Sequence, residues 1–285
     1  MANYQWTRRE FLVVAGAAST GALGLPSPCD KTLTSDYRQR VLAKRPIAYW
    51  RLGESKGPNA FDATKHAYNG TFHGTPTYGE VGAIRQDPDT AIKLDGRHSY
   101  VEIPESEQFS QAASGQGLTI EVWMRPDTLV FEGETNDPYI HWLGKGDTRQ
   151  YEWAFRFYSK ESTRPNRISA YIWNRAGGLG AGAYFQDPLQ PSEWIHVVAC
   201  YDPGEETNPR AGVSIFKNGV LRGGPATQSG ALYRTFNIMP IRGTAPLRFG
   251  TRDLKSFFIG GLDEVAVYPR LLTPAEVLDN YRGGT

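Results

Sequence analysis

The sequence predicts an all-β fold, a two-sheet antiparallel jelly-roll sandwich with a short helix near each end. Three observations predict it. First, 31 glycines and 19 prolines are spread along the 285 residues between short apolar runs, as in strands joined by turns. Second, about a dozen runs alternate apolar and polar side chains with the two-residue period of strands. Third, no helices alternate with these runs, which argues against a parallel βα fold.

The predicted strands follow one another from residue 47 to residue 268. Their ranges are 47–52, 91–95, 99–103, 118–125, 139–144, 151–159, 167–173, 182–185, 193–201, 213–221, 246–250 and 257–268. Asn218-Gly219 interrupts the run 213–221, and this pair predicts a tight hairpin because both residues tolerate positive φ. No repeat and no linker rich in Pro, Gly or Ser divides the chain, so we expect one domain over residues 46–285.

Short helices are predicted at both ends of this domain. Residues 35–44, with a capping Ser or Asp and apolar side chains at helical spacing, predict a helix that ends before Pro46, within a linker of residues 29–45. Near the C-terminus, Thr273, Pro274 and Glu276 predict a capping box at the start of a helix that ends before Gly283.

Residues 1–28 resemble a twin-arginine signal peptide, which carries folded proteins out of the cytoplasm. Arg8 and Arg9 precede Phe11 and Leu12, and a soft apolar stretch continues to Leu25. This stretch is shorter than the roughly 20 apolar residues that a membrane span needs. We therefore expect an exported protein that is periplasmic, cell-surface or secreted, without a membrane span. A general secretory signal or a buried N-terminal helix is the alternative.

Charge and cysteine content argue against nucleic-acid binding, a disulfide-stabilised fold and a zinc site. Lys and Arg number 31 against 30 Asp and Glu, a formal charge of +1, so no broad basic field is available to attract nucleic acid. Cys29 and Cys200 can form neither a disulfide framework nor a four-cysteine zinc site. Cys29 follows the apolar stretch, where a lipoprotein carries its lipid, although the preceding residues depart from that pattern. Cys200 is expected to be buried and inert.

Six sequence segments together carry a family resemblance. They are residues 48–74, beginning AYWRLGE, residues 82–104, LTIEVWMRP, EWIHVVACYD, VSIFKNG, and the final FIGGLDEVAVYPRLLTPAEVLDNY. In this order they resemble laminin-G-like domains of the concanavalin A-like lectin/glucanase superfamily. The resemblance implies a jelly-roll sandwich that often carries a structural calcium and recognises sugars or proteins. Some branches cleave glycans, so the fold alone does not select the function.

Catalysis is not expected. A glycosidase needs two facing carboxylates, and the resembled glucanases carry theirs closely spaced on one strand. The nearest approach, Glu102, Glu105 and Glu107, is interrupted by Pro104, and we interpret it as a solvated acidic loop. Glu121 and Glu152 stand singly on their strands. The histidines lack metal-ligand spacing, and no nucleophile elbow is present.

The resemblance places a structural calcium near the first and last strands of the sandwich. The matching positions are Asp263 in GLDEV and Asp62 in FDATKHAYNG, with Glu54 and backbone oxygens near Gly96 as weaker additions. Lys65 departs from the loop of the relatives. The alternative is that Asp62 and Asp263 only cap turns.

A sugar-binding face is the functional hypothesis with most residues behind it. In residues 151–159, Tyr151, Trp153, Phe155 and Phe157 are expected to face the core, and alternation sends Arg156 and Tyr158 to the other face. On the next strand, Arg167, Tyr171 and Trp173 share an outward face, which Asn174 extends. Aromatic rings can stack on a pyranose while arginines bind its hydroxyls. The alternative is that Tyr171 and Trp173 are covered and only fill space.

The sequence therefore predicts an exported, calcium-supported binding module for a polysaccharide or glycoconjugate. A polysaccharide hydrolase with a divergent acidic pair and a structural module that binds a surface protein are the alternatives.

Overall fold

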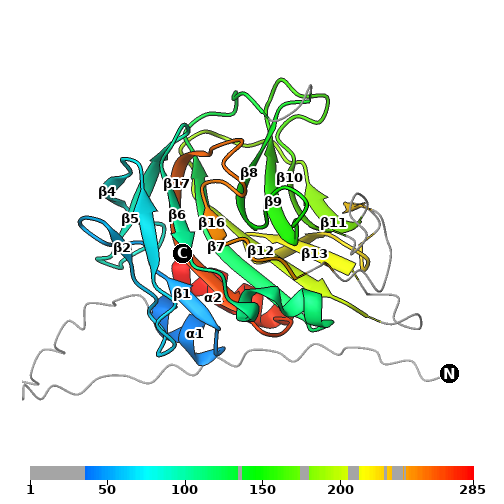
Figure 1. The fold of residues 1–285 in the computed structure, drawn as a ribbon, viewed down its shortest axis with the longest axis horizontal. Helices are drawn as coiled ribbons and strands as arrows, with labels where there is room; N and C mark the ends of the chain where they lie inside the picture. Colours follow the sequence, from blue (N-terminus) through cyan, green and yellow to red (C-terminus); the bar gives the residue numbers. More distant parts are fainter. Residues whose placement is uncertain are drawn as a thin grey trace, which may run out of the picture. The chain divides into compact units, whose positions relative to one another are not determined.

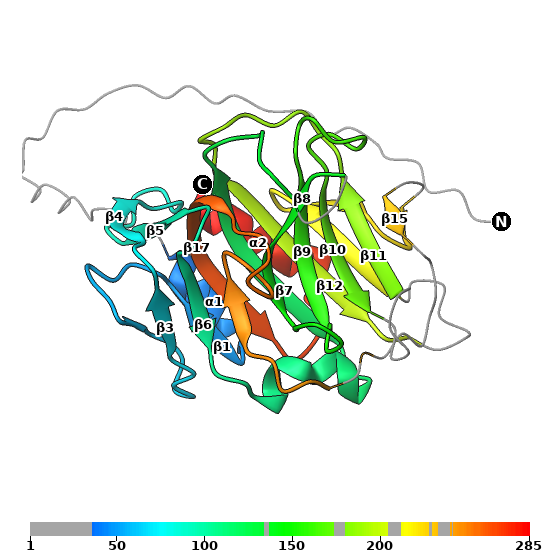
Figure 2. The same cartoon turned by 45° about the horizontal axis from the view of Figure 1, so that its top comes forward.

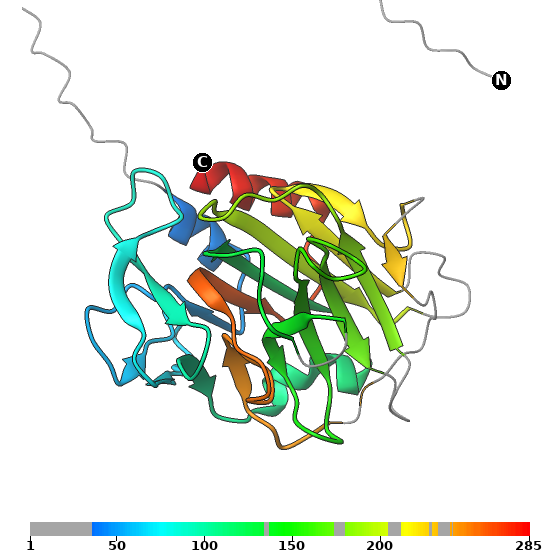
Figure 3. The same cartoon turned by 90° about the horizontal axis from the view of Figure 1, so that it is seen from above.

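The all-β sandwich predicted from the sequence is confirmed. The computed structural model describes residues 36–133, 137–173, 180–204, 212–227, 230–232, 240 and 242–285. Within them, two antiparallel sheets pack face to face, and two helices cover the outer side of one sheet (Figure 1; Figure 3). The predicted signal peptide and residues 29–35 of the predicted linker, which include Cys29, lie outside the described residues.

We call the sheet under the helices the first sheet. Its strands are, in order, β14 (Val220–Gly223), β13 (Gly212–Lys217), β12 (Ile195–Asp202), β7 (Leu118–Pro126), β17 (Ile259–Tyr268), β5 (Thr90–Asp95) and β4 (Thr77–Val81), with β1 (Ala48–Trp50) also beside β17. The second sheet runs β15 (Ala231–Leu232), β11 (Gly180–Phe185), β10 (Ile168–Trp173), β9 (Trp153–Tyr158), β8 (Tyr139–Lys145), β16 (Leu247–Phe249), β6 (Tyr100–Ile103), β3 (Gly70–His73) and β2 (Asn59–Ala60).

The main core lies between the two sheets and is built by strand alternation. On β9, Trp153, Phe155 and Phe157 point into it, as predicted, while Arg156 and Tyr158 lie on the outer face. On β10, Ile168 and Ile172 also point into the core. Each fully buried large apolar side chain contributes about 1.5–3 kcal/mol, so this interior is the main stabilising term. Alternation therefore decides which side chains the second sheet presents outward.

The predicted hairpin is confirmed. Asn218 and Gly219 join β13 to β14 with φ angles of 51° and 76°. Two successive positive φ angles match the right-handed twist of the flanking strands.

Both predicted helices are present. Helix α1 spans Tyr37–Ala43, although the side chain of Asp36 does not cap it and binds Arg40 instead. Helix α2 spans Pro274–Gly284 and begins with the predicted capping box. It continues through the two glycines at which the sequence predicted its end. A Cβ at Gly284 would lie 2.8 Å from the Trp123 ring, so this turn of the helix packs where only glycine fits.

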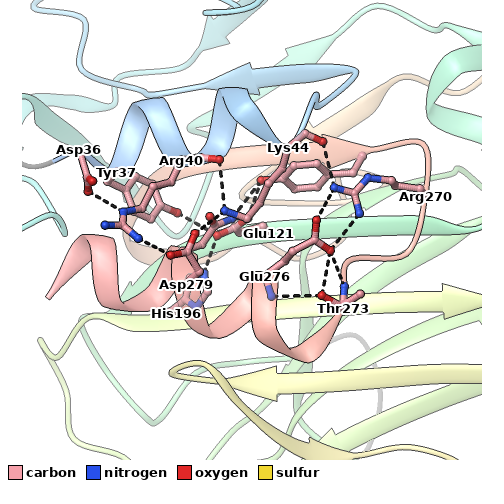
Figure 4. A network of polar contacts seen from close by, with 12 residues as sticks. Asp36, Tyr37, Arg40, Lys44, Glu121, His196, Arg270, Thr273, Glu276 and Asp279 are labelled. Atoms are coloured by element: carbon pink, nitrogen blue, oxygen red, sulfur yellow. Dashed lines mark hydrogen bonds and ion pairs between the residues drawn. The ribbon is translucent and has the colours of Figure 1, made fainter.

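A buried polar network fastens both helices to the first sheet (Figure 4). Glu121 of β7 is fully buried and accepts hydrogen bonds from Tyr37 of α1, Asn280 of α2 and Tyr268 of β17. His196 Nε2 of β12 lies 2.7 Å from Glu121 Oε1. Burial alone would raise the pKa of Glu121, but these hydrogen bonds and the His196 charge outweigh it and lower that pKa. The glutamate that stands alone in sequence is thus the centre of a structural network.

The sequence missed several short elements. Strands β2, β3, β4 and β15 and the 3-10 helix at Glu107–Ser114 were not predicted. Strand β2 has only two residues, and β4 alternates between exposed and half-buried side chains without a buried face. Such segments lack the apolar periodicity that identifies a strand.

Candidate functional site

The predicted binding residues come together on the outer face of the second sheet, where β8–β11 lie side by side (Figure 2). Strand β9 supplies Arg156 and Tyr158, and β10 supplies Tyr171 and Trp173. Arg167 directly precedes β10. Asn174, the remaining predicted residue, lies outside the described residues. The alternation deduced from the sequence therefore brings these side chains together, whereas their role in binding stays a prediction.

Arg156 lies at the centre of this face. Its guanidinium carbon is 4.6 Å from the centre of the Tyr171 ring and 5.8 Å from those of Tyr139 and Tyr158. Guanidinium groups over ring faces are held by cation–π attraction. The side chain of Arg156 makes no hydrogen bond or ion pair with a described residue, and its Nε is buried without a partner.

Two more arginines, Arg164 and Arg167, lie near the ring of Tyr158. Arg167 lies 3.8 Å from the Tyr184 ring centre and 6.0 Å from that of Tyr158, and it donates to the amide oxygen of Gln186. Burial and the nearby Arg164 charge lower the pKa of Arg167, while Tyr184 opposes the shift. Arg164 lies 4.7 Å from the Tyr158 ring centre and is ion-paired with Asp137.

Arg252, which sequence reasoning did not single out, completes the face from the loop between β16 and β17. Its guanidinium lies 4.0 Å from the Tyr151 ring centre and 5.0 Å from that of Trp173, and it donates to Asp253. Tyr151 was predicted to face the core, and this is wrong: its ring packs on Trp173. Strand β9 begins only at Trp153, so the alternation does not extend back to Tyr151.

The rings predicted to stack on a sugar are covered. The exposed fractions are 2% for Tyr158, 5% for Tyr171 and 9% for Trp173. Arginines lie over their faces, while Arg156, Arg167 and Tyr184 themselves remain half-buried. The surface therefore presents guanidinium groups supported by aromatic rings, instead of bare rings. We call Arg156, Arg164, Arg167 and Arg252, with the rings beneath them, the arginine face.

The carboxylates considered for catalysis all have structural partners. On the acidic segment, Glu102 pairs with Arg248, and Glu105 and Glu107 pair with Arg242. Glu152 is fully buried, where its Oε1 lies 2.6 Å from Lys145 Nζ. Glu121, buried on the first sheet, likewise pairs with His196 and Tyr268, so each of the carboxylates considered has a partner within the protein.

The predicted calcium ligands are not brought to one point. Asp62 accepts hydrogen bonds from the backbone N–H groups of Tyr49, Thr64 and Tyr68, which fold its own loop. Glu54 accepts from the Phe61 N–H, and Asp263 from the Ala83 N–H. This division agrees with the alternative that Asp62 organises a turn.

Asp263 is buried beside other acidic residues that surround Arg51. Burial and the charge of Glu264 hold the pKa of Asp263 well above its usual range, and Arg51 already pairs with Glu264, Asp87 and Asp89. Among the described side chains, no three His, Cys, Asp or Glu residues are grouped to hold one metal ion. Calcium stays a prediction from the resemblance.

The thiol of Cys200 is buried, as predicted. Burial raises its pKa to about 11, so a nucleophilic role does not arise. None of the helices in the part of the chain that the structure describes has the length and hydropathy needed to cross a bilayer.

Comparison with solved structures gives likenesses in fold. Domain 4 of AbnA, a GH43 extracellular arabinanase from Geobacillus stearothermophilus solved with arabinotriose, is 18% identical with a TM-score of 0.51, over 83% of this chain and 98% of that domain. The receptor-binding domain of botulinum neurotoxin C/D mosaic serotype is 10% identical with a TM-score of 0.57, over 84% and 51%. The binding domain of botulinum neurotoxin DC, solved with rat synaptotagmin II, is 11% identical with a TM-score of 0.58, over 84% and 52%.

This chain spans about half the length of the neurotoxin domains that it matches. None of the curated proteins matches the sequence. The model of a laminin-G-like family, described as the concanavalin A-like lectin/glucanases superfamily, matches residues 95–278, more than half of the chain. This match covers β6–β17 and the loops between them, which include the arginine face. The chain belongs to the concanavalin A-like lectin/glucanases superfamily.

Proposed function

We propose that this protein is an exported carbohydrate-binding module without catalytic activity, and that the arginine face is its binding surface. The observation that carries the proposal is that the half-buried Arg156 and Arg167 are held over aromatic rings across β8–β11, beside the buried Arg252. Arginine N–H groups in fixed orientations suit the hydroxyl and acidic groups of a sugar. Rigid strands position them, which lowers the ordering cost of binding.

The architecture supports this choice of surface. The helices cover the outer side of the first sheet, whereas no helix in the described residues lies on β8–β11 (Figure 3). The likeness to an arabinanase domain solved with arabinotriose supports a glycan as the ligand class, although an identity of 18% shows the fold alone.

Binding without cleavage is the form that the side chains favour. A glycosidase needs one carboxyl group as acid and a second as base or nucleophile, both facing the substrate. The carboxylates considered above are engaged by arginine, lysine, histidine or tyrosine partners. The hydrolase remains the alternative that a release assay decides.

A surface module that binds protein is the second candidate. The likeness to a neurotoxin domain solved with rat synaptotagmin II favours it, because that domain engages a protein. Such a module would bind no polysaccharide, which separates it from the proposal.

Retention of the full chain on insoluble and immobilised polysaccharides tests the proposed function. The panel is run in calcium and in chelator, and the supernatants are assayed for new reducing ends. We expect retention on at least one polysaccharide without release of sugar. Release of reducing ends would establish the hydrolase instead, and no retention anywhere would favour the protein-binding module.

A further inference from the structure

We propose that the arginine face selects an acidic glycan, one that carries carboxylate or sulfate groups, over a neutral glycan of the same backbone. This inference rests on the proposed function and names the ligand class of the same site. It follows from the charge balance of the face, from the hydrogen bonds that its arginines leave unused, and from the coverage of its aromatic rings.

The face carries more positive than negative charge. Arg156, Arg164 and Arg167 all lie within 6.0 Å of the centre of the single Tyr158 ring. Asp137, bound to Arg164, is the only carboxylate that the described contacts bring to these three groups. Arg156 has no carboxylate partner among the described residues, and Arg167 has only the neutral Gln186. Two of the three guanidinium charges are therefore uncompensated within the described structure.

The uncompensated charges are also the least engaged hydrogen-bond donors. A guanidinium has five N–H donors in a planar fork that matches a carboxylate or sulfate with two parallel bonds. None of the five on Arg156 bonds to a described residue, and its Nε is buried without a partner. Arg156 is held over three rings and has no carboxylate partner among the described residues. An anion can therefore bind it without first displacing a protein carboxylate.

Coverage of the rings disfavours a purely neutral ligand. A neutral pyranose gains much of its binding energy by stacking its apolar side on an exposed ring. Here Arg156 lies over Tyr171 and Arg252 over Trp173, and both rings are less than a tenth exposed. A neutral sugar would meet charged groups whose hydration it cannot replace fully, whereas an acidic sugar replaces water with an ionic hydrogen bond.

Two matched pairs of polymers test the inference on the full chain. Polygalacturonate is compared with its carboxyl-reduced form, and dextran sulfate with dextran, so that each pair shares a backbone and differs in charge. We expect the affinity for an acidic member to exceed that for its neutral partner by at least about tenfold, equivalent to about 1.4 kcal/mol at 25 °C. The first pair reports on carboxylates and the second on sulfates.

Variants assign the effect to the face. Arg156→Gln and Arg167→Gln should each weaken binding to the acidic polymer by about tenfold or more, because each removes one charged hydrogen-bond partner. Arg85→Gln is the matched control: this exposed arginine lies between β4 and β5 at the first sheet, and its side chain makes no hydrogen bond or ion pair with a described residue. It should bind like the native chain. Far-UV circular dichroism and melting temperature verify that every variant is folded.

Each other result overturns the inference in a distinct way. Equal affinity for both members of each pair would refute acid selectivity while the proposed function stands. An equal loss in Arg85→Gln and Arg156→Gln would show a non-specific charge effect. No binding to any polymer, acidic or neutral, in this set or in the polysaccharide panel would refute the proposed function as well.

Discussion

Replacing Glu121 by Gln tests whether the buried network is structural. The substitution keeps the size of the side chain and removes its charge. One carboxylate oxygen lies near Tyr37 and His196 at 3.1 and 2.7 Å, and the other near Tyr268 and Asn280 at 2.7 and 2.8 Å. A glutamine retains one acceptor oxygen, so two of these four interactions lose their acceptor.

The cost follows from these two losses. A buried donor left without an acceptor costs about 1–3 kcal/mol, and rotation of the Tyr268 hydroxyl recovers part of this, so we expect a loss of about 2–4 kcal/mol. For a domain of this size, each kcal/mol lowers the melting temperature by about 2–4 °C. The matched control is Glu107→Gln, whose side chain is 63% exposed. Its surface ion pair with Arg242 contributes at most about 1 kcal/mol.

Urea unfolding followed by tryptophan fluorescence measures the effect at two pH values. Because the folded pKa of Glu121 is lowered, its stabilising contribution is complete above its unfolded pKa and declines as the pH falls through the folded value. The difference between native and Glu121→Gln should therefore be largest near pH 7 and shrink in acid. A difference below about 0.5 kcal/mol at pH 7 would refute the network's structural role. Polysaccharide retention should not change, because Glu121 lies on the first sheet.

Three further predictions concern export, the charge of Asp263 and the binding of calcium. A reporter fused to residues 1–35 should leave the cytoplasm, and Arg8→Lys with Arg9→Lys should block that movement; unchanged export would exclude the twin-arginine route. Burial raises the pKa of Asp263 above its unfolded value of 3.8, so native stability should fall as the pH rises through the folded pKa. Asp263→Asn, which mimics the protonated acid, should raise the melting temperature at pH 8 in chelator; a lower one would contradict this. The predicted calcium would raise the melting temperature of the native chain and not of this variant, and identical native curves in calcium and in chelator would contradict it.

The sequence predicted most of the sandwich because its long strands carry a clear period. Residues 151–159 and 167–173 show which side chains face the core and which face outward, and the contacts agree from Trp153 onward. The capping box at Thr273 and the Asn218-Gly219 turn were equally local patterns. Short strands such as β2 and the 3-10 helix at Glu107–Ser114 carry no such period.

Contacts between distant segments could not be predicted in the same way. Arg252 reaches Trp173 from a loop 79 residues later in the chain, and Glu121 meets Asn280 across 159 residues. Nothing in the local pattern marks either pair. Alternation shows that Tyr171 and Trp173 point away from the core, but it cannot show that arginines cover them. The outward face was therefore predictable, whereas its charged character emerged from the tertiary contacts.

Hydroxyl-radical footprinting of the full chain with polygalacturonate tests most directly where a glycan binds. Tyr139 and Tyr184 are half-buried within the arginine face, and Phe61, which is 55% exposed, lies beside β2 at the opposite end of the second sheet. Binding at the arginine face predicts lower oxidation of Tyr139 and Tyr184 when the polymer is present, with Phe61 unchanged. Protection of Phe61 alone, or of no side chain on the arginine face, would contradict the account.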